Sequence, residues 1–297
     1  MRRHVVAAAG RTLVLGERPW LMGIVNASPD SFSDAGAYPD LDARLRRARE
    51  LLAAGADIID VGGESAITRR PPVAVVEELE RVVPLVERIA GELGAPVSVD
   101  TFKPAVAEAA IAAGAAMVND VSGLRDAELA SVCGRTGAAL VLMHTRAAPK
   151  QRLQDPELYD DVVADVVAFL RERMEVARAH GVRDEQLILD PGPDFAKTPA
   201  QTIALLRRLE ELHALGRPLL LAVSRKDFVG ALTKRAPRER LAGTLAALAR
   251  GVDAGAHVLR VHDVAEAADF LAVRAALRGE VEVDPALALD DAIRHAR

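Results

Sequence analysis

The sequence is poor in cysteine, in aromatic residues and in long apolar runs. One cysteine, Cys133, allows neither an intramolecular disulfide nor a multi-cysteine zinc site, which favours a reducing compartment, and we expect the cytoplasm. Aromatic residues make up only 3% of the chain, too few for the stacking platforms that bind single-stranded nucleic acid. No uninterrupted apolar run approaches the roughly 20 residues of a membrane-spanning helix. We therefore expect neither nucleic acid nor a membrane as a partner.

The chain also lacks an excess of positive charge. Its net charge is −5, and Lys and Arg are interspersed with Asp and Glu, so any phosphate would be recognised locally and not by a basic face. Apolar residues are 50% of the total, enough for a large aliphatic core. At 297 residues the chain is long enough for two ordinary domains or for one large α/β barrel.

Short apolar segments alternate with longer helix-compatible segments along the chain. The expected strands are 21–26, 57–62, 96–100, 116–120, 139–144, 187–190, 218–224 and 257–263. Such nearly continuous apolar strands are typical of a parallel sheet that helices cover on its outer face. Eight βα units without an intervening linker predict an α/β fold, a single-domain (β/α)8 TIM barrel.

We divide the chain into three parts. Residues 1–20 contain two short apolar runs around Ala-Gly and are expected to form a β-hairpin that closes the bottom of the barrel. The barrel itself is expected over 21–280, and 281–297 form a C-terminal extension with a short helix.

Polar residues at the carboxyl ends of the strands mark the expected site, since TIM barrels carry their chemistry there. Asp100, Asn119, Asp190 and Lys226 offer two carboxylates, an amide and an ammonium, which suit the donors and acceptors of a flat polar heterocycle. Each carboxylate alone could instead cap a helix or loop. The convergence of four such residues from four strands favours a binding site.

An anion site is expected beside them. Arg260 and His262 alternate along the last strand and so point to the same face, where TIM barrels often bind phosphate. The alternative for Arg260 is a structural pair with a barrel carboxylate. Mg²⁺ could be held by Asn26 and phosphate oxygens, whereas His144 has no second ligand at metal spacing.

Several sequence strings carry a family resemblance. In order along the strands these are MGIVNASPDSFSDAG, DIIDVGGES, SVDT, VND, LMH, LILDPG, VSRK and LRVHDV. Together they resemble dihydropteroate synthase, of the pterin-binding barrel family, over about residues 20–275. The resemblance implies a transferase of folate biosynthesis that joins 6-hydroxymethyl-7,8-dihydropterin pyrophosphate to p-aminobenzoate, releases pyrophosphate, uses Mg²⁺ and forms a homodimer.

The resemblance also assigns roles to residues. It implies that the pterin is bound by Asp100, Asn119, Met143, Asp190 and Lys226. It implies that Asn26, Arg260 and His262 hold the pyrophosphate, with Asn26 also on the metal, and that Phe195 and Ser224 line the aminobenzoate side. Asp34, in the long first loop, would act at the metal or at the cationic pterin methylene once that loop closes. Catalysis is thus expected from Asn26, Asp34, Lys226, Arg260 and His262.

Departures from the family pattern fall on the aminobenzoate side. The family string GGESTRPG is replaced by GGESAITRRPP, which leaves Thr68 and Arg69 as the nearest substitutes for its Thr-Arg pair. The glycine-rich run after DPG is replaced by PDFAK, which introduces Asp194. Asp227 follows VSRK where Ser, Thr or Arg is usual. A carboxylate at Asp194 is expected to repel the carboxylate of p-aminobenzoate and weaken its use.

Two other functions stay open. A paralogue could bind the pterin but use another acceptor, transfer a methyl group or only bind, although a methyltransferase would not need the pair formed by Arg260 and His262. An unrelated barrel enzyme could use Lys226 as a Schiff-base lysine, as aldolases do.

Overall fold

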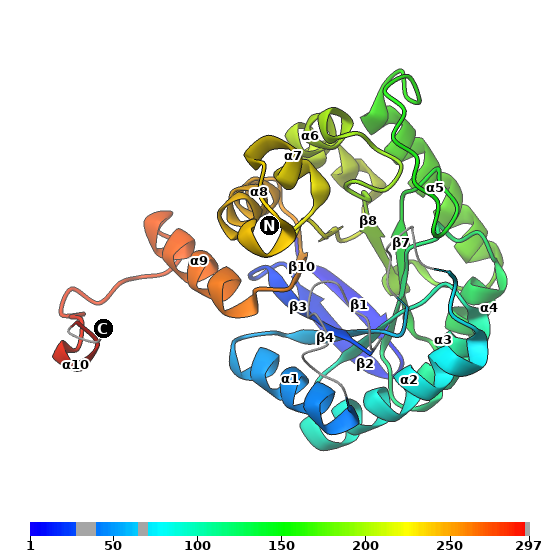
Figure 1. Ribbon diagram of the computed structural model, residues 1–297, viewed down its shortest axis with the longest axis horizontal. Coiled ribbons are helices and arrows are strands. Elements are labelled where there is room, and N and C mark those ends of the chain that lie inside the picture. The colour runs from blue at the N-terminus through cyan, green and yellow to red at the C-terminus, as the bar shows by residue number, and fades with distance from the viewer. Residues whose placement is uncertain (28–39, 65–70, 295–297) are drawn as a thin grey trace.

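The computed structural model describes residues 1–27, 40–64 and 71–294, and it has the predicted barrel architecture (Figure 1). The eight parallel strands run in the order β8-β7-β6-β5-β4-β3-β10-β9, and a bridge between Leu189 and Leu219 joins the two ends. The strands are β3 (Trp20–Asn26), β4 (Ile58–Gly62), β5 (Val97–Asp100), β6 (Met117–Asp120), β7 (Ala139–Met143), β8 (Leu187–Asp190), β9 (Leu220–Leu221) and β10 (Val258–Val261). The seventh expected strand is shortened to two residues.

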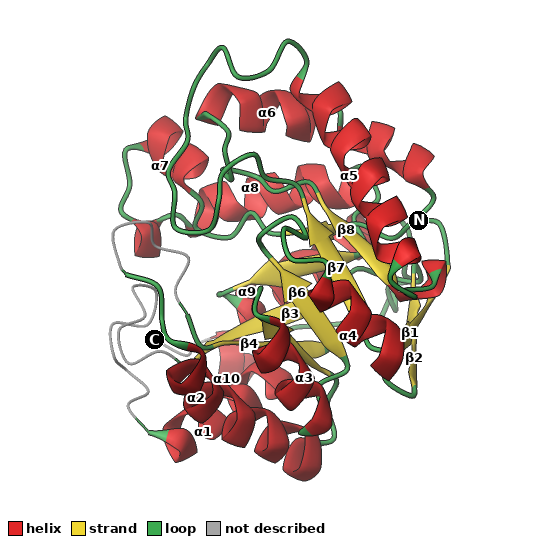
Figure 2. Ribbon diagram, turned by 90° about the vertical axis from the view of Figure 1, so that its right-hand side faces the viewer, coloured by secondary structure: helices red, strands yellow, loops and turns green. Residues whose placement is uncertain are grey.

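Helices surround the strands (Figure 2). They are α1 (Leu41–Ala53), α2 (Val75–Arg88), α3 (Pro104–Ala112), α4 (Glu128–Thr136), α5 (Val162–Ala179), α6 (Pro199–Arg207), α7 (Asp227–Thr233), α8 (Leu241–Asp253) and α9 (Val264–Leu277). Capping residues in the sequence determine where several of these helices begin. The Asp161 carboxylate caps α5, and Thr198 with Gln201 forms a capping box before Pro199 at the first position of α6. No helix in the described residues is long and apolar enough to span a membrane.

The amino-terminal hairpin is present as predicted. Strands β1 (His4–Ala8) and β2 (Arg11–Leu15) pair antiparallel, and the Ala9 N–H bonds the Gly137 carbonyl at 2.8 Å. The buried side chains of Val6 and Leu13 belong to an apolar cluster that also contains inward-pointing side chains from most barrel strands. The hairpin therefore covers the bottom of the barrel.

Successive side chains of each strand point alternately toward the surrounding helices and toward the barrel axis. On β4, Ile59 and Val61 join the cluster between strands and helices, whereas Ile58 joins the cluster above the hairpin. Asp60 lies two residues after Ile58 and so points to the barrel axis as well. The same alternation places a polar layer above the apolar one.

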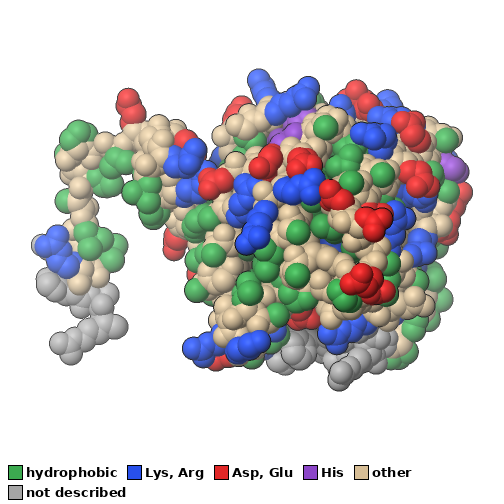
Figure 3. All heavy atoms as spheres, turned by 90° about the horizontal axis from the view of Figure 1, so that it is seen from above, with side chains coloured by type: hydrophobic (Ala, Val, Ile, Leu, Met, Phe, Trp, Pro, Cys, Tyr) green, Lys and Arg blue, Asp and Glu red, His purple; other side chains and the backbone are tan. Residues whose placement is uncertain are grey.

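The C-terminal extension leads away from the barrel (Figures 1 and 3). It follows α9 and ends in the short helix α10 (Asp291–Arg294), in agreement with the predicted short helix. Leu287 and Leu289 are 75% and 55% exposed, so this segment adds little to the core.

Candidate active site

The polar layer at the carboxyl ends of the strands forms the candidate site. Inward positions on seven strands supply Asn26, Asp60, Asp100, Asn119, Met143, Asp190 and Arg260, and the segments just after β9 and β10 add Ser224 and His262. The strand repeat of two residues brings these side chains to one end of the barrel axis. Most of the residues predicted from the strand ends therefore share one layer.

An ion-pair network occupies the centre of this layer. The Arg260 Nε donates to Asp60 Oδ2 at 2.6 Å, and its Nη2 donates to Asp100 Oδ2 at 2.7 Å. The Asn119 amide also donates to Asp60 Oδ2, at 3.3 Å. Arg260 thus makes the barrel-carboxylate contacts that were its structural alternative. Because these bonds use two of the five N–H donors of a guanidinium, they leave the phosphate role a prediction.

Asp60 is a site residue that the sequence reasoning missed. Its side chain is fully buried, and its Oδ1 has no hydrogen-bond partner in the described structure. Such an atom is costly to bury, which is typical of a position that completes its bonding with a ligand. The available signal was a carboxylate inside an otherwise apolar strand, IIDVG.

Burial changes the acidity of the charged groups here. Desolvation raises the pKa of Asp100, and the neighbouring carboxylates of Asp60 and Glu78 add to this effect against the opposing Arg260. Desolvation likewise raises the pKa of Asp190, although its Oδ1 accepts the Gly192 N–H at 2.7 Å. Both carboxyl groups are thereby shifted toward a form that can donate as well as accept hydrogen bonds.

Lys226 and Phe195 form the side of the site next to β8 and β9. The Lys226 Nζ lies 4.2 Å from the centre of the Phe195 ring, which is a cation–π geometry. Burial lowers the pKa of Lys226, while the carboxylates of Asp194 and Asp190 oppose this change. Two residues that were predicted to face different substrates are therefore in direct contact.

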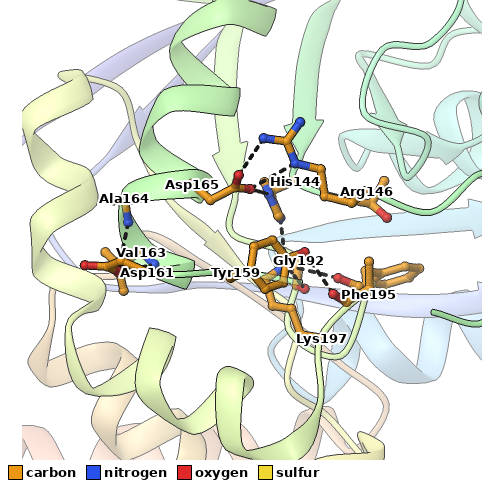
Figure 4. Close-up of polar contacts among 12 residues, drawn as sticks. His144, Arg146, Tyr159, Asp161, Val163, Ala164, Asp165, Gly192, Phe195 and Lys197 are labelled. Carbon is orange, nitrogen blue, oxygen red and sulfur yellow. Dashed lines mark hydrogen bonds and ion pairs between the residues drawn. The ribbon is translucent and has the colours of Figure 1, made fainter. Parts of the chain in front are cut away.

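The loop after β8 is anchored from beneath by a buried lysine (Figure 4). The fully buried Lys197 Nζ contacts His144 Nδ1 at 2.7 Å and donates to the carbonyls of Gly192 and Phe195 at 2.9 and 3.1 Å. His144 Nε2 in turn meets Asp165 Oδ1 at 2.8 Å. His144 is thus committed to the loop anchor.

The protonation states of this anchor follow from its geometry. Burial lowers the pKa of His144 to about 4, assisted by the Lys197 charge, so the ring is neutral and can accept at Nδ1 and donate from Nε2. Burial also lowers the pKa of Lys197 to about 7. Three acceptors around its Nζ match the three protons of an ammonium, and the carboxylates of Asp190 and Asp165 also oppose the effect of burial.

His262 lies beside Ser224 at the end of the barrel strands. The His262 N–H donates to Ser224 Oγ at 3.2 Å, and its ring Nδ1 lies 3.1 Å from the same oxygen. Burial lowers the pKa of His262 to about 3, with Arg225 and Arg260 contributing, so the imidazole is neutral.

The second loop begins at an anchored carboxylate. Lys103 Nζ donates to Glu64 Oε2 at 2.6 Å and to the Val73 carbonyl at 2.7 Å, and it also pairs with Glu78. The predicted residues Asp34, Thr68 and Arg69 lie outside the described residues.

The donor set for a metal is sparse. In the part of the chain that the structure describes, no group of three or more His, Cys, Asp or Glu side chains could hold a metal ion. Asn26, at the end of β3, offers an amide oxygen at the rim of the polar layer. One protein oxygen together with substrate phosphates and water is a ligand set that Mg²⁺ accepts, so the residues present fit this ion.

Comparison with known proteins defines the class of this site. The family model described as "Pterin binding enzyme" matches residues 22–262, and the chain belongs to the pterin-binding enzyme family. Dihydropteroate synthase from Synechocystis is 42% identical over 271 residues, which is 90% of this chain and 93% of that protein. The Bacillus subtilis dihydropteroate synthase is 43% identical over 266 residues, 89% and 90% of the two chains.

Solved structures agree. Xanthomonas albilineans dihydropteroate synthase with 4-aminobenzoic acid has a TM-score of 0.85 and 43% identity, covering 93% of this chain and 99% of that chain. The same enzyme in complex with 7,8-dihydropteroate has a TM-score of 0.81 and 42% identity, covering 92% and 98%. The unrelated aldolase-type alternative for Lys226 therefore loses its basis.

Proposed function

We propose that this chain is a dihydropteroate synthase, a transferase that condenses 6-hydroxymethyl-7,8-dihydropterin pyrophosphate with p-aminobenzoate and releases pyrophosphate. The observation that carries the proposal is the polar layer of the barrel, in a chain that is more than 40% identical to dihydropteroate synthases along most of its length. In that layer Asp100, Asn119 and Asp190 supply two carboxyl groups and one amide group. These groups match the donors and acceptors around a pterin ring.

The proposed mechanism requires no protein nucleophile. Asp60, Asp100, Asn119 and Asp190 bind the pterin ring by its edge, and Lys226 contributes a cation held against Phe195. Holding the ring in place orients its methylene carbon toward the incoming amine.

Arg260 and His262, on the other side of the polar layer, are proposed to bind the pyrophosphate leaving group. Arg260 is fixed by its two carboxylates and presents its remaining N–H groups, and the neutral imidazole of His262 adds a further hydrogen-bonding group. Such preorganised donors stabilise charge that develops during bond cleavage. When bound, Mg²⁺ held by Asn26 would neutralise pyrophosphate charge. Asp34, Thr68, Arg69 and Ser224 keep their predicted roles at the cation and the amine.

A paralogue with another acceptor is the second candidate, favoured by the altered second loop and by Asp194. A coupled assay of pyrophosphate release, with and without p-aminobenzoate, distinguishes the two. Release that depends on p-aminobenzoate supports the synthase. Tight binding of the pterin pyrophosphate without p-aminobenzoate-dependent release would support the paralogue.

The proposed enzyme is a cytoplasmic homodimer. An apolar hollow of about 240 Å³ lies between α6, α7 and α8, lined by residues that include Leu206, Phe228 and Leu232, and Leu232 is 64% exposed. An exposed apolar face of this kind is suited to a second copy. Sedimentation should give a dimer for the parent and a monomer for Leu232→Glu; a monomeric parent would contradict the proposal. The buried, unpaired Cys133 fits a reducing compartment.

A further inference from the structure

Asp194 occupies an unusual backbone position in the loop between β8 and α6. Its φ is 64°, in the left-handed region that favours glycine. Its N–H donates to Thr202 Oγ1 at 3.1 Å, and the Thr202 hydroxyl returns a bond to Asp194 Oδ1 at 3.2 Å. These two bonds hold the strained residue on α6 and aim its second carboxylate oxygen away from that helix.

The second carboxylate oxygen reaches across to another helix. Asp194 Oδ2 accepts the N–H of Phe228, in the first turn of α7, at 3.1 Å. The residue before α7, Lys226, makes no side-chain cap of its own. Asp194 therefore satisfies a helix N–H group that has no partner within α7.

This bond joins the two chain segments that carry the Lys226 and Phe195 pair. Phe195 directly follows Asp194, and Lys226 lies two residues before Phe228. The cation–π distance of 4.2 Å thus depends on the relative placement of the β8–α6 loop and the start of α7. Arg225, the residue before Lys226, also has a left-handed backbone, with φ 59°. Its backbone N–H donates to the Thr244 hydroxyl, and its side chain donates to Asp263.

We propose that Asp194 is a positioning residue that ties the β8–α6 loop to the start of α7 and so holds the charged Lys226 against Phe195 on the pterin side of the site. The proposal rests on the proposed function for its ligand, but not for its geometry. It gives Asp194 a role other than the expected repulsion of p-aminobenzoate, because both carboxylate oxygens accept hydrogen bonds within the chain. Its charge also opposes the effect of burial on the pKa of Lys226.

Two substitutions distinguish the hydrogen bond from Phe228 to Asp194 from the negative charge of the Asp194 carboxylate. Asp194→Asn keeps an oxygen that can accept the Phe228 N–H and tolerates a positive φ, but removes the charge. Asp194→Gly suits the backbone and removes both. Asp227→Asn is the matched control: the carboxylate it removes is adjacent to Lys226, but its side chain is 71% exposed and paired with Arg240.

The first measurement needs no substrate. The rate at which acetic anhydride labels the Lys226 amine, followed by mass spectrometry from pH 6 to 11, reports its protonation. In Asp194→Asn and Asp194→Gly we expect the midpoint to move down by about 1 pH unit, because a nearby opposite charge is lost. Asp227→Asn should move it far less, since water screens an exposed charge.

The second measurement is calorimetry with 6-hydroxymethylpterin at pH 7.5, together with steady-state kinetics. Asp194→Gly should weaken pterin binding about 10-fold, as expected for a lost buried hydrogen bond and displaced partner. Asp194→Asn should recover most of this affinity. In Asp194→Gly the KM for p-aminobenzoate should rise and not fall, because Phe195, which is predicted to line the p-aminobenzoate side, is displaced.

An unchanged labelling midpoint in both Asp194 variants, or a gain confined to the KM for p-aminobenzoate, would overturn the positioning role. A parent enzyme that binds no pterin, but whose Lys226 midpoint still moves on substitution of Asp194, would refute the proposed function and leave the positioning role intact.

Discussion

The lower and upper halves of the barrel interior are built from the same strands but have opposite chemistry. Below, Met22, Ile58 and Val258 pack on the hairpin in an apolar cluster. Above, two residues further along β4 and β10, Asp60 and Arg260 form a buried ion pair. Apolar burial stabilises the fold, whereas buried charge costs desolvation that its partners must offset. The lower half therefore supports stability and the upper half function.

The sharpest test of this division is Arg260→Met. It leaves Asp60 and Asp100 without their cation, so we expect a loss of about 3–5 kcal/mol in the free energy of unfolding, in addition to lost activity. Urea denaturation measures the first and the pyrophosphate assay the second. Affinity for the pterin pyrophosphate should fall more than affinity for free hydroxymethylpterin. Equal losses for both ligands would mean that Arg260 serves only the ion-pair network.

A substitution in the lower half of the barrel should reduce stability but leave activity nearly unchanged. Leu13→Ala opens a cavity beneath the barrel, where Leu13 is 4% exposed, and should cost about 2–5 kcal/mol of stability. We expect kcat at 25 °C to stay close to that of the parent. Val5→Ala, on the exposed side of the same hairpin, is the control and should change neither quantity. A large fall in kcat for folded Leu13→Ala would break the comparison.

Asp190→Ala and Lys226→Ala test the upper half without removing its central cation. Each leaves ring groups of the pterin without a partner, at about 1–3 kcal/mol, or about 5- to 150-fold in affinity. Isothermal calorimetry with the pterin gives the value directly. Unchanged pterin affinity in both variants would defeat the assignment of this face.

Lys197 should make the stability of the protein depend on pH. Burial lowers its pKa from 10.5 in the unfolded chain to about 7 in the folded protein. Between these values the unfolded state holds the extra proton, so this group makes stability rise with pH, by at most about 1.4 kcal/mol per unit. Urea denaturation at pH 7 to 9.5 should show this rise in the parent but not in Lys197→Met. Equal slopes in the two proteins would show that Lys197 stays charged.

Much of the fold was predictable because strand and helix periods are local. The segment 187–190 was predicted with the bounds that β8 has, and the other barrel strands except β9 differ from prediction by one or two residues at an end. Strand-end position also brought Asp100, Asn119 and Asp190 together, because parallel strands end at one edge.

The partners of these residues were not predictable. Asp60 lies within an apolar strand, so its role was not evident from the sequence. Its contact with Arg260 joins residues 200 positions apart. The bond from the Phe228 N–H to Asp194 was not predictable either, since it depends on how two loops meet. Motifs mark which residues converge, whereas the contacts among them arise only from tertiary packing.

The hairpin packs against the lower end of the barrel interior, so the polar layer is closed from below. A ligand in contact with Asn119, which is 2% exposed, lies deeper than one near the rim and has to enter before the rim is filled. With the lower end closed, we expect substrates and products to pass the carboxyl ends of the strands one after the other. Inhibition patterns that fit an ordered mechanism, with the pterin entering first, are the kinetic counterpart of the closed floor; random-order patterns would contradict it.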